Sequence, residues 1–361
     1  MRVDTFSYEL PPDLIAQRPA EDPQDARLLR VGEPNDPIKR VGDLAELLPV
    51  GALVVVNDTR VLPARLHGRK QKTHGRVELL LAQRTGSLSV DLGNGQTVAA
   101  ETWRAMGRAS KGFATGTEVL IEADGTTLVA RVLGRGDDGL LDVALWSLSG
   151  APVADTLRAV GHVPLPPYIR RADTPQDATR YQTVFAKFDG AIAAPTAGLH
   201  FTPALVQRLQ ARGCHLVSVT LHVGLGTFKP VATEDLDDHP MHEESFVVSQ
   251  AAADAITDAR VRGAPVVAIG TTVVRALESA ARGTVVEPTD STTRLLIQPG
   301  YRFRVVDLLL TNFHLPRSTL LALVCAFGGT APILEAYRVA VAHRFRFYSY
   351  GDAMLVARRN P

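Results

Sequence analysis

The sequence predicts an α/β protein into which a second, all-β unit is inserted. Two observations support this fold class. From about Asp189 onward, short hydrophobic strands alternate with helical patterns, which is typical of βαβ units around a mostly parallel sheet. Between Leu62 and Pro164, short strand-like runs are instead separated by Asn-Gly and Asp-Gly pairs, which favour tight β-hairpins.

The α/β part is expected to draw on both ends of the chain. A buried-strand pattern at residues 53–56 precedes the all-β segment, whereas the other α/β elements follow it. We therefore predict a three-layer, mostly parallel sheet domain over residues 1–62 and 161–361, with an inserted β-barrel-like domain over residues 63–160. The joints are Leu62-Pro63 and the proline-rich stretch at residues 162–171.

Each element follows from its local pattern. In the inserted unit, the expected strands are 77–82, 88–91, 117–121, 126–133 and 140–145. In the α/β part, the expected strands are 191–194, 216–223 and 266–269, and the expected helices are 203–212, 251–262 and 273–282. Thr202 followed by Pro203 marks a helix start, and Gly213 marks its end. The loop at residues 195–201 then lies at the sheet end where α/β proteins bind ligands.

The charge balance narrows the function classes. The chain has 39 Lys and Arg against 38 Asp and Glu, which argues against a general nucleic-acid coat or a polybasic membrane binder. Cys214 and Cys325 lie far apart in apolar contexts, so we expect both to be buried and reduced. The start of the chain does not resemble a signal peptide, and the longest apolar run, near residues 320–327, is too short for a membrane span. A cytoplasmic protein without a membrane partner is the default expectation.

The segment at residues 266–279 is the first candidate ligand site. It is predicted as a strand, the turn Gly270-Thr271-Thr272 and a helix, so free N–H groups and the positive helix end would face a carboxylate or phosphate. Simple threonine capping is the alternative. The GxG at residues 224–226 lacks the third glycine of a dinucleotide fingerprint, so a Rossmann site is only weakly indicated.

Histidines and carboxylates gather in a second region. His239, His242, Glu243 and Glu244 lie within six residues and could form a metal site, supply a general base or form a solvated acidic loop. The spacing is not that of an HExxH helix, and Pro240 would break such a helix. We therefore favour a base or a substrate contact over a metal.

Three further histidines, His200, His222 and His314, follow expected strands or lie in expected loops. One such histidine is most often structural, but three at strand ends favour a shared pocket.

Basic residues cluster once without an acidic neighbour in the sequence. The stretch from Arg60 to Arg76 holds six lysines and arginines and no Asp or Glu. Such a local field suits a polyphosphate backbone, and a solvated strand face is the alternative. The string RFRFYSYGD at residues 344–352 interleaves arginine with aromatic residues, which suits base stacking or, equally, a half-buried strand.

Nine blocks resemble those of one family, in the family's order and along nearly the whole chain. They are NDTRVLPARL (57–66), GHVPLPPYI (161–169), RYQTVFA (180–186), AAPTAGLHF (193–201), VTLHVGLGTFKPV (219–231), MHEE (241–244), IGTTVVRALE (269–278), TNFHLPRSTLL (311–321) and FRFYSYGDAML (345–355). The chain is thereby similar to the S-adenosylmethionine:tRNA ribosyltransferase-isomerase family of queuosine biosynthesis. It departs from the usual pattern at Val273 and Lys229, and residues 86–160 match mainly in pattern.

The resemblance implies that the ribosyl part of S-adenosylmethionine is transferred onto 7-aminomethyl-7-deazaguanine at the wobble position of a tRNA with a GUN anticodon. The ribose would be isomerised to an epoxycyclopentane diol, giving epoxyqueuosine in the tRNA, adenine and methionine. S-adenosylmethionine is then a co-substrate, no permanently bound cofactor and no metal are expected, and we expect a monomer.

This chemistry assigns roles to the candidate residues. Removing a proton beside the sulfonium needs a base, for which the candidates are His200, His222, His242 and Glu244. Departure of adenine needs an acid or polar clamp, for which Asp352 or Asn312 would serve. Aromatic side chains that would hold the sulfonium and stack the nucleobase are Tyr181, Phe201, Phe228 and Tyr350.

The remaining expected contacts divide between the small substrate and tRNA. Further substrate contacts are expected from Asn57, Asp58, Arg60, Thr196, Gly198, Gly270, Thr271, Thr272, Arg275 and His314. Expected tRNA contacts are Arg65, Arg69, Lys70, Lys72 and Arg76.

Two other functions stay open when the family is set aside. One is a metal-dependent hydrolase that uses His239, His242 and Glu244. The other is a non-enzymatic RNA-binding module that uses the basic cluster and residues 344–352.

Overall fold

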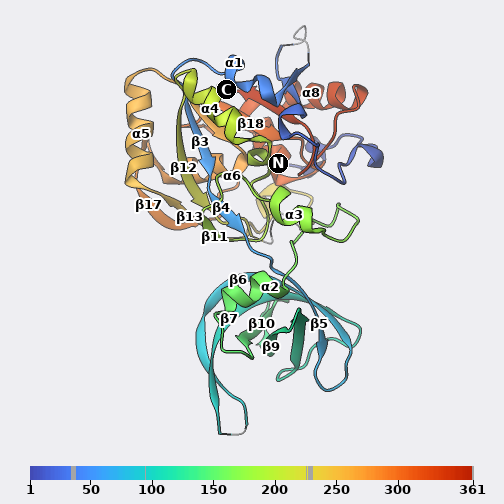
Figure 1. The fold of residues 1–361 in the computed structure, drawn as a ribbon. Coiled ribbons are helices and arrows are strands. Elements are labelled where there is room, and N and C mark those ends of the chain that lie inside the picture. The colour runs from blue at the N-terminus through green and yellow to red at the C-terminus, as the bar shows by residue number, and fades with distance from the viewer. Residues whose placement is uncertain (34–37, 94, 225, 227–230, 360–361) are drawn as a thin grey trace.

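The structure is a computed structural model that describes residues 1–33, 38–93, 95–224, 226 and 231–359. The chain forms two lobes, an upper α/β lobe and a lower lobe of strands, joined through a narrow waist (Figure 1). The α/β lobe contains elements from before and after the lower lobe in the sequence.

The upper lobe is built on a nine-stranded sheet. From one edge to the other its order is β17 (Thr289–Thr293), β13 (Glu244–Val248), β12 (His215–Leu221), β3 (Leu53–Asn57), β14 (Val266–Ile269), β18 (Leu308–Asn312), β19 (Ala353–Ala357), β1 (Arg27–Arg30) and β2 (Lys39–Arg40). Strands β12, β3, β14 and β18 run parallel to one another, and β1 runs parallel to β19.

The α/β class is confirmed, but the sheet is mixed and not mostly parallel. Strand β13 pairs antiparallel with β12 and β17, β19 with β18, and β2 with β1. Asn312 at the end of β18 lies opposite Ala353 at the start of β19. The two helices between them therefore return the chain to the end where β18 stopped, whereas a parallel neighbour requires a crossover to the opposite end.

Helices cover both faces of this sheet. Leu53 and Val55 of β3 point to one core, and Val54 and Val56 point to the other, because successive side chains of a strand alternate. Helices α5 (Gln250–Val261), α6 (Thr271–Ala280), α7 (Thr319–Gly328) and α8 (Thr330–Ala342) pack into the first core. Helices α1 (Leu44–Leu47) and α4 (Pro203–Ala211) pack into the second.

Local signals place several elements correctly. The Oγ1 atom of Thr202 accepts a hydrogen bond from the Leu205 N–H at 3.2 Å, and Pro203 opens α4. Gly213, just past its end, has a φ of +79°, a conformation that glycine adopts without strain. Strand β14 has the predicted bounds, and β3, β12, α5 and α6 lie within two residues of theirs.

Two expected strands are wrong. The strand expected at 191–194 is β11 (Phe188–Ala191), which pairs with β4 (Thr59–Val61) in a separate two-stranded sheet. Residues 344–352 turn, with positive φ at Arg344 and Tyr348, so the half-buried strand considered there is not formed.

The lower lobe consists of a closed antiparallel barrel with the strand order β10-β7-β6-β5-β8-β9. Its strands are β5 (Arg65–Lys70), β6 (Arg76–Asp91), β7 (Thr97–Ala109), β8 (Glu118–Ala123), β9 (Thr126–Arg135) and β10 (Leu141–Ser147). Helix α2 (Val153–Val160) adds Val153, Leu157 and Val160 to the barrel core.

The barrel corrects the strand predictions in this segment. The expected strands 77–82 and 88–91 are one strand, β6. Strands β5 and β7 were not predicted. Strand β7 is rich in Ala, Glu, Arg and Met, and these residue types favour helices when taken alone. Pairing with β6 on one side and β10 on the other decides its conformation.

Short elements complete the described part of the chain. They are α3 (Pro175–Arg180), β15 (Ala281–Arg282), β16 (Val285–Val286) and the 3-10 turns η1 (Val3–Phe6), η2 (Pro12–Leu14), η3 (Pro23–Asp25), η4 (Val41–Asp43), η5 (Thr196–His200) and η7 (Leu236–Asp238). Within the described part of the chain, no single helix has the length and apolar character to cross a membrane, although α7 and α8, bent by 115°, meet that test when taken together.

Candidate functional site

A cavity of about 270 Å³ lies where β12, β14 and β18 end. The carboxyl ends of neighbouring parallel strands are where open α/β sheets bind ligands. We call it the strand-end cavity. The sequence-predicted residues that line it are Tyr181, Thr196, His242, Glu244, Gly270, Thr271, Thr272, Arg275, Asn312 and His314.

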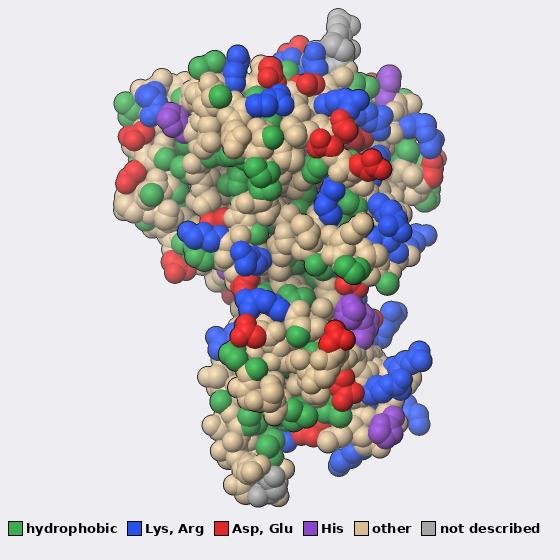
Figure 2. Space-filling view, in the orientation of Figure 1, with side chains coloured by type: hydrophobic (Ala, Val, Ile, Leu, Met, Phe, Trp, Pro, Cys, Tyr) green, Lys and Arg blue, Asp and Glu red, His purple; other side chains and the backbone are tan. Residues whose placement is uncertain are grey.

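A second cavity of about 680 Å³ lies between the two lobes, near the waist visible in Figure 2. We call it the inter-lobe cavity. Its lining from the α/β lobe includes Asp189, His222, Gly224, Ser245 and Arg294, and its lining from the barrel includes Arg84, Glu101, Trp103, Arg104 and Asp138. Val223, His242 and Glu244 line both cavities, so the two spaces meet there.

Glu244 at the start of β13 forms a buried ion pair with Arg275 of α6. The side chains are 5% and 9% exposed. The other Glu244 oxygen accepts the Gly224 N–H at 3.2 Å, and Arg275 Nε donates to the Leu295 carbonyl at 3.1 Å. Because pairing and hydrogen bonds offset the cost of burying both charges, the two groups have a defined place beside the cavity.

Asn312 at the end of β18 is held from several sides. Its Oδ1 accepts from Thr196 Oγ1 at 3.0 Å, and its Nδ2 donates to the Tyr348 carbonyl and to His200 Nε2, both at 3.2 Å. Burial lowers the pKa of His200 to about 4, so the ring is neutral near pH 7 and its Nε2 accepts this bond. His200 is absent from both cavity linings and stands behind Asn312 as a positioning residue.

His314 lines the strand-end cavity directly. Its Nε2 lies 2.9 Å from Thr311 Oγ1, and its backbone N–H donates to Tyr337 Oη at 2.8 Å. Burial lowers the pKa of His314 to about 4, so this imidazole is also neutral near pH 7.

His222 faces the inter-lobe cavity instead. Its Nδ1 lies 2.7 Å from Thr59 Oγ1. Burial lowers the pKa of His222, against the opposing effect of Asp58 and Asp189. The structure therefore separates three of the predicted histidines: His200 is behind the first cavity, His314 is inside it and His222 is in the second.

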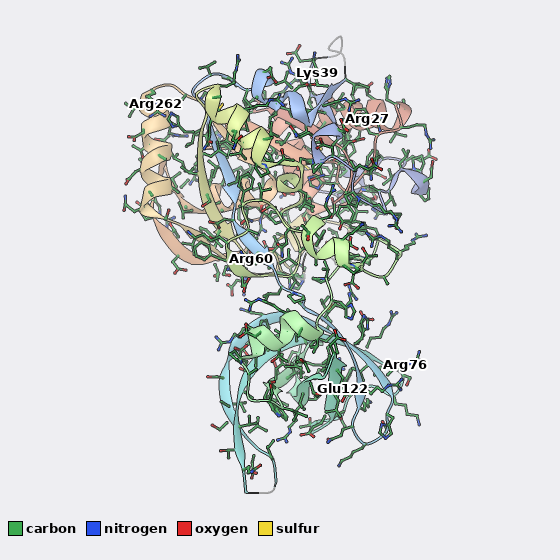
Figure 3. All side chains as sticks on the ribbon, in the orientation of Figure 1. Arg27, Lys39, Arg60, Arg76, Glu122 and Arg262 are labelled. Carbon is green, nitrogen blue, oxygen red and sulfur yellow. The ribbon has the colours of Figure 1, made fainter. Side chains whose placement is uncertain are left out.

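Asn57, Asp58 and Arg60 lie outside both cavity linings. Asn57 Nδ2 donates to the Leu221 carbonyl at 3.0 Å. The Asp58 carboxylate accepts from two hydroxyls of β12, at 2.6 and 2.7 Å. Arg60, at the base of the α/β lobe in Figure 3, donates to the Ala186 carbonyl at 2.9 Å. These contacts secure the chain where it leaves β3 for the barrel.

Asp352 and Tyr350 are also absent from the two linings. The Asp352 carboxylate accepts from Arg27 Nε and Nη2 at 3.1 and 2.9 Å, and from the Arg346 N–H at 2.7 Å. Tyr350 donates to Asp177 at 2.8 Å. Both side chains therefore hold the C-terminal segment in place beside the cavity.

Among the other predicted contacts, Phe201 packs in the core at 5.4 Å from the Phe185 ring, and Gly198 lies against Thr183. Neither lines a cavity. Phe228 lies outside the described residues.

The predicted basic cluster splits in the structure. Arg65 pairs with Glu78 and donates to the Leu165 carbonyl at 3.0 Å, so it secures the joint between the lobes. Arg60, described above, also lies at this joint. The other four members, Arg69, Lys70, Lys72 and Arg76, belong to the β5–β6 hairpin, along the edge of the barrel where blue side chains gather in Figure 2 and Arg76 is labelled in Figure 3.

The sequence reasoning missed several lining residues. Tyr168 Oη lies 2.6 Å from Ser349 Oγ, and both border the strand-end cavity with Thr311. Tyr168 lies within a block that carried the family resemblance, which is the signal that could have identified it. Trp103 and Arg104 of the inter-lobe cavity lie in the segment that matched mainly in pattern.

The residues considered for a metal site, His239, His242 and Glu244, all line the strand-end cavity. No group of three His, Cys, Asp or Glu side chains within the described ranges is arranged to hold a metal ion. The Glu244 carboxylate is engaged by Arg275 and by the Gly224 N–H.

Two cavities that meet beside an inserted barrel suit an enzyme that brings a small molecule to a larger partner. The chain belongs to the queuosine biosynthesis protein family, whose model matches residues 3–356. This match confirms the resemblance seen in the sequence.

Named relatives agree with the family match. An S-adenosylmethionine:tRNA ribosyltransferase-isomerase of Sorangium cellulosum is 57% identical over 99% of this chain and 98% of its own. One of the same name from Anaeromyxobacter sp. (strain Fw109-5) is 50% identical over 99% of each chain. A crystal structure of S-adenosylmethionine tRNA ribosyltransferase from Thermotoga maritima is 35% identical, with a TM-score of 0.53 over 97% of this chain and 99% of that one.

Proposed function

We propose that this chain transfers the ribosyl part of S-adenosylmethionine to tRNA and isomerises it, as the names of its relatives state for them. The observation that carries the proposal is the meeting of the two cavities at His242 and Glu244. A small molecule in one cavity and a nucleotide in the other would then lie next to each other beside these two residues.

S-adenosylmethionine is assigned to the strand-end cavity. Four aromatic rings line it, from Tyr168, Tyr181, Phe313 and Tyr348. Aromatic faces attract a cation such as the sulfonium and stack on a base such as adenine. Asn312, whose amide is held on both sides, is the polar clamp proposed for the departing adenine.

The modified nucleotide is assigned to the inter-lobe cavity. Its lining holds the indole of Trp103 and the guanidinium groups of Arg84, Arg104 and Arg294. Each arginine pairs with a carboxylate of the same lining, Glu101, Asp138 or Glu243, which a nucleotide would have to displace or share. Aromatic and arginine side chains are the usual partners of unstacked bases and phosphates. We propose 7-aminomethyl-7-deazaguanine at the wobble position of a GUN-anticodon tRNA as the acceptor and epoxyqueuosine as the product.

His242 is the proposed base. Among the four candidate bases, only His242 and Glu244 line the strand-end cavity, and Glu244 is paired with Arg275. A base at the boundary can reach a substrate carbon next to the sulfonium in one cavity while the acceptor amine approaches from the other.

The finer assignments complete the proposal. The α/β domain comprises residues 1–62 and 161–361, and the inserted barrel-like domain comprises residues 63–160. We propose that the protein acts as a monomer. The tRNA body is assigned to the β5–β6 hairpin, the reaction to the cytoplasm, and no bound cofactor or metal is required.

The test is to incubate the protein with S-adenosylmethionine and tRNA carrying the aminomethyl base, and to analyse the products by mass spectrometry. Adenine, methionine and the epoxide nucleoside are expected together. Binding of tRNA without consumption of S-adenosylmethionine would instead indicate an RNA-binding module. Stoichiometric zinc in the purified protein would favour the hydrolase.

A further inference from the structure

The Arg275 guanidinium has one nitrogen without a partner. Nη1 pairs with Glu244, and Nε donates to the Leu295 carbonyl. Nη2 is buried, and no described residue offers it an acceptor within hydrogen-bond distance. The side chain is only 9% exposed and lines the strand-end cavity. Nη2 itself has almost no accessible surface, so the guanidinium must turn slightly for this nitrogen to meet an acceptor in the cavity. Because a buried donor left unpaired costs about 1 to 3 kcal/mol, that contact would be favoured.

The first turn of α6 faces the same cavity. Gly270, Thr271 and Thr272 line it, and Gly270 precedes the helix with a φ of +93°. The first N–H groups of a helix have no intrahelical partner and lie at its positive end. Thr271 and Arg275 are four residues apart, so their side chains project from the same face of α6.

We infer that Arg275 Nη2 and the first turn of α6 hold the amino-acid carboxylate of S-adenosylmethionine. The inference rests on the proposed function and deepens it. An α-amino acid carries a carboxylate and an ammonium group close together, and the Arg275–Glu244 pair presents the complementary charges at the cavity wall. Glu244 therefore has a second use, as the acceptor for the ammonium group.

A tRNA phosphate is the competing anion for this donor set. It has no ammonium group to engage Glu244. The donors lie in the strand-end cavity and not in the inter-lobe cavity, whose lining includes neither Arg275 nor the α6 turn. These two observations favour the carboxylate.

The experiment compares two ligands, with and without the carboxylate, on two proteins, with and without the Arg275 guanidinium. Binding of S-adenosylmethionine and of its decarboxylated analogue is measured by titration calorimetry without tRNA. The wild-type protein should prefer S-adenosylmethionine by about ten- to a hundredfold, the range for a hydrogen bond to a charged group. Arg275→Lys keeps a cation beside Glu244 but loses the second guanidinium nitrogen. It should remove most of that preference and leave the affinity for the analogue nearly unchanged.

Arg338→Lys is the matched control, because Arg338 is 76% exposed on α8 and pairs with Glu335 outside both cavities. It should change neither affinity.

Several results would overturn the inference. Equal binding of the two ligands by the wild-type protein does so without any variant, so the test does not depend on Arg275→Lys folding correctly. An equal loss for both ligands in Arg275→Lys would show that Arg275 only shapes the cavity. Unchanged ligand binding with weakened tRNA binding would assign the donors to a phosphate. If the wild-type protein bound neither ligand and released no adenine with modified tRNA, the proposed function would fail as well.

Discussion

Replacing Asp177 should destabilise the α/β lobe. Its carboxylate is 2% exposed and accepts two hydrogen bonds from Arg171, at 2.7 and 2.8 Å. It also accepts from Thr174 N and Oγ1 and from Tyr350 Oη, each at 2.8 Å. Tyr350 adjoins Ser349, whose hydroxyl contacts Tyr168 in the wall of the strand-end cavity.

Asp177→Asn keeps the shape of the side chain but leaves Arg171 without its counter-ion. Removing one partner of a buried ion pair costs about 3 to 5 kcal/mol. Because the Arg171 side chain is 17% exposed and can recover some hydration, we expect about 3 kcal/mol. The matched control is Asp4→Asn, since Asp4 is 57% exposed beside Arg317 and its removal should cost less than about 1 kcal/mol.

The destabilisation should also depend on pH. Burial raises the pKa of Asp177, but the hydrogen bonds from Arg171, Tyr350 and Thr174 outweigh burial and hold that pKa well below its ordinary value. A carboxylate with a lowered native pKa contributes stability above its unfolded pKa of about 3.9 and loses it as the pH falls toward the native pKa. At pH 3 the wild-type advantage should be smaller by about 1.3 kcal/mol than at pH 7, from proton binding to the unfolded state.

Urea unfolding followed by circular dichroism at 222 nm measures this effect, because the helices other than α2 lie in the α/β lobe. The fluorescence of Trp103 and Trp146 reports on the barrel and should shift less. A loss below about 1 kcal/mol at pH 7, or a loss independent of pH down to 3, would refute the reasoning.

Three other predictions concern the reaction and tRNA binding. His242→Ala should fold normally and lower the rate of adenine release by about 10²- to 10⁴-fold, and near wild-type release would reject His242 as the base. His200→Ala should mainly raise KM for S-adenosylmethionine, because it loosens Asn312; a large loss of kcat with unchanged KM would contradict a positioning role. Charge removal at the β5–β6 hairpin should weaken tRNA binding and lower its salt slope by about 2, and an unchanged slope would place the tRNA elsewhere. The residues to neutralise are Arg69, Lys72 and Arg76.

The fold could be predicted where a pattern is local. Thr202 and Pro203 define the start of α4 through a cap and a fixed φ, and the four-residue apolar run of β14 is bounded by turn residues. Strand β7 could not be predicted, because its residues favour a helix and its conformation comes from partners on both sides. The antiparallel pairing of β19 with β18 could not be predicted either, because it depends on how the bent pair α7 and α8 brings the chain back to the end of β18.

The candidate site shows the same division. Family blocks supplied Tyr181, His242, Asn312 and Arg275 as candidates, and all four line the strand-end cavity. Residue type alone could not separate His200 from His242, because both are histidines in predicted loops. Only the fold buries the first behind Asn312 and places the second between the cavities.

The amino-acid sequence by itself determined the α/β class, the insertion of an all-β unit, the main helix boundaries of the central region and the family. The fold class and the helix boundaries can be read from periodicity and capping, which involve only a few neighbouring residues. The family can be read from sequence blocks that occur in a fixed order. The tertiary structure decided which charges pair and which side chains face a cavity. Glu244 and Arg275 are 31 residues apart in the sequence and meet only because β13 and α6 pack together. The packing of these two elements depends on burial and charge pairing throughout the lobe, not on the residues next to either one.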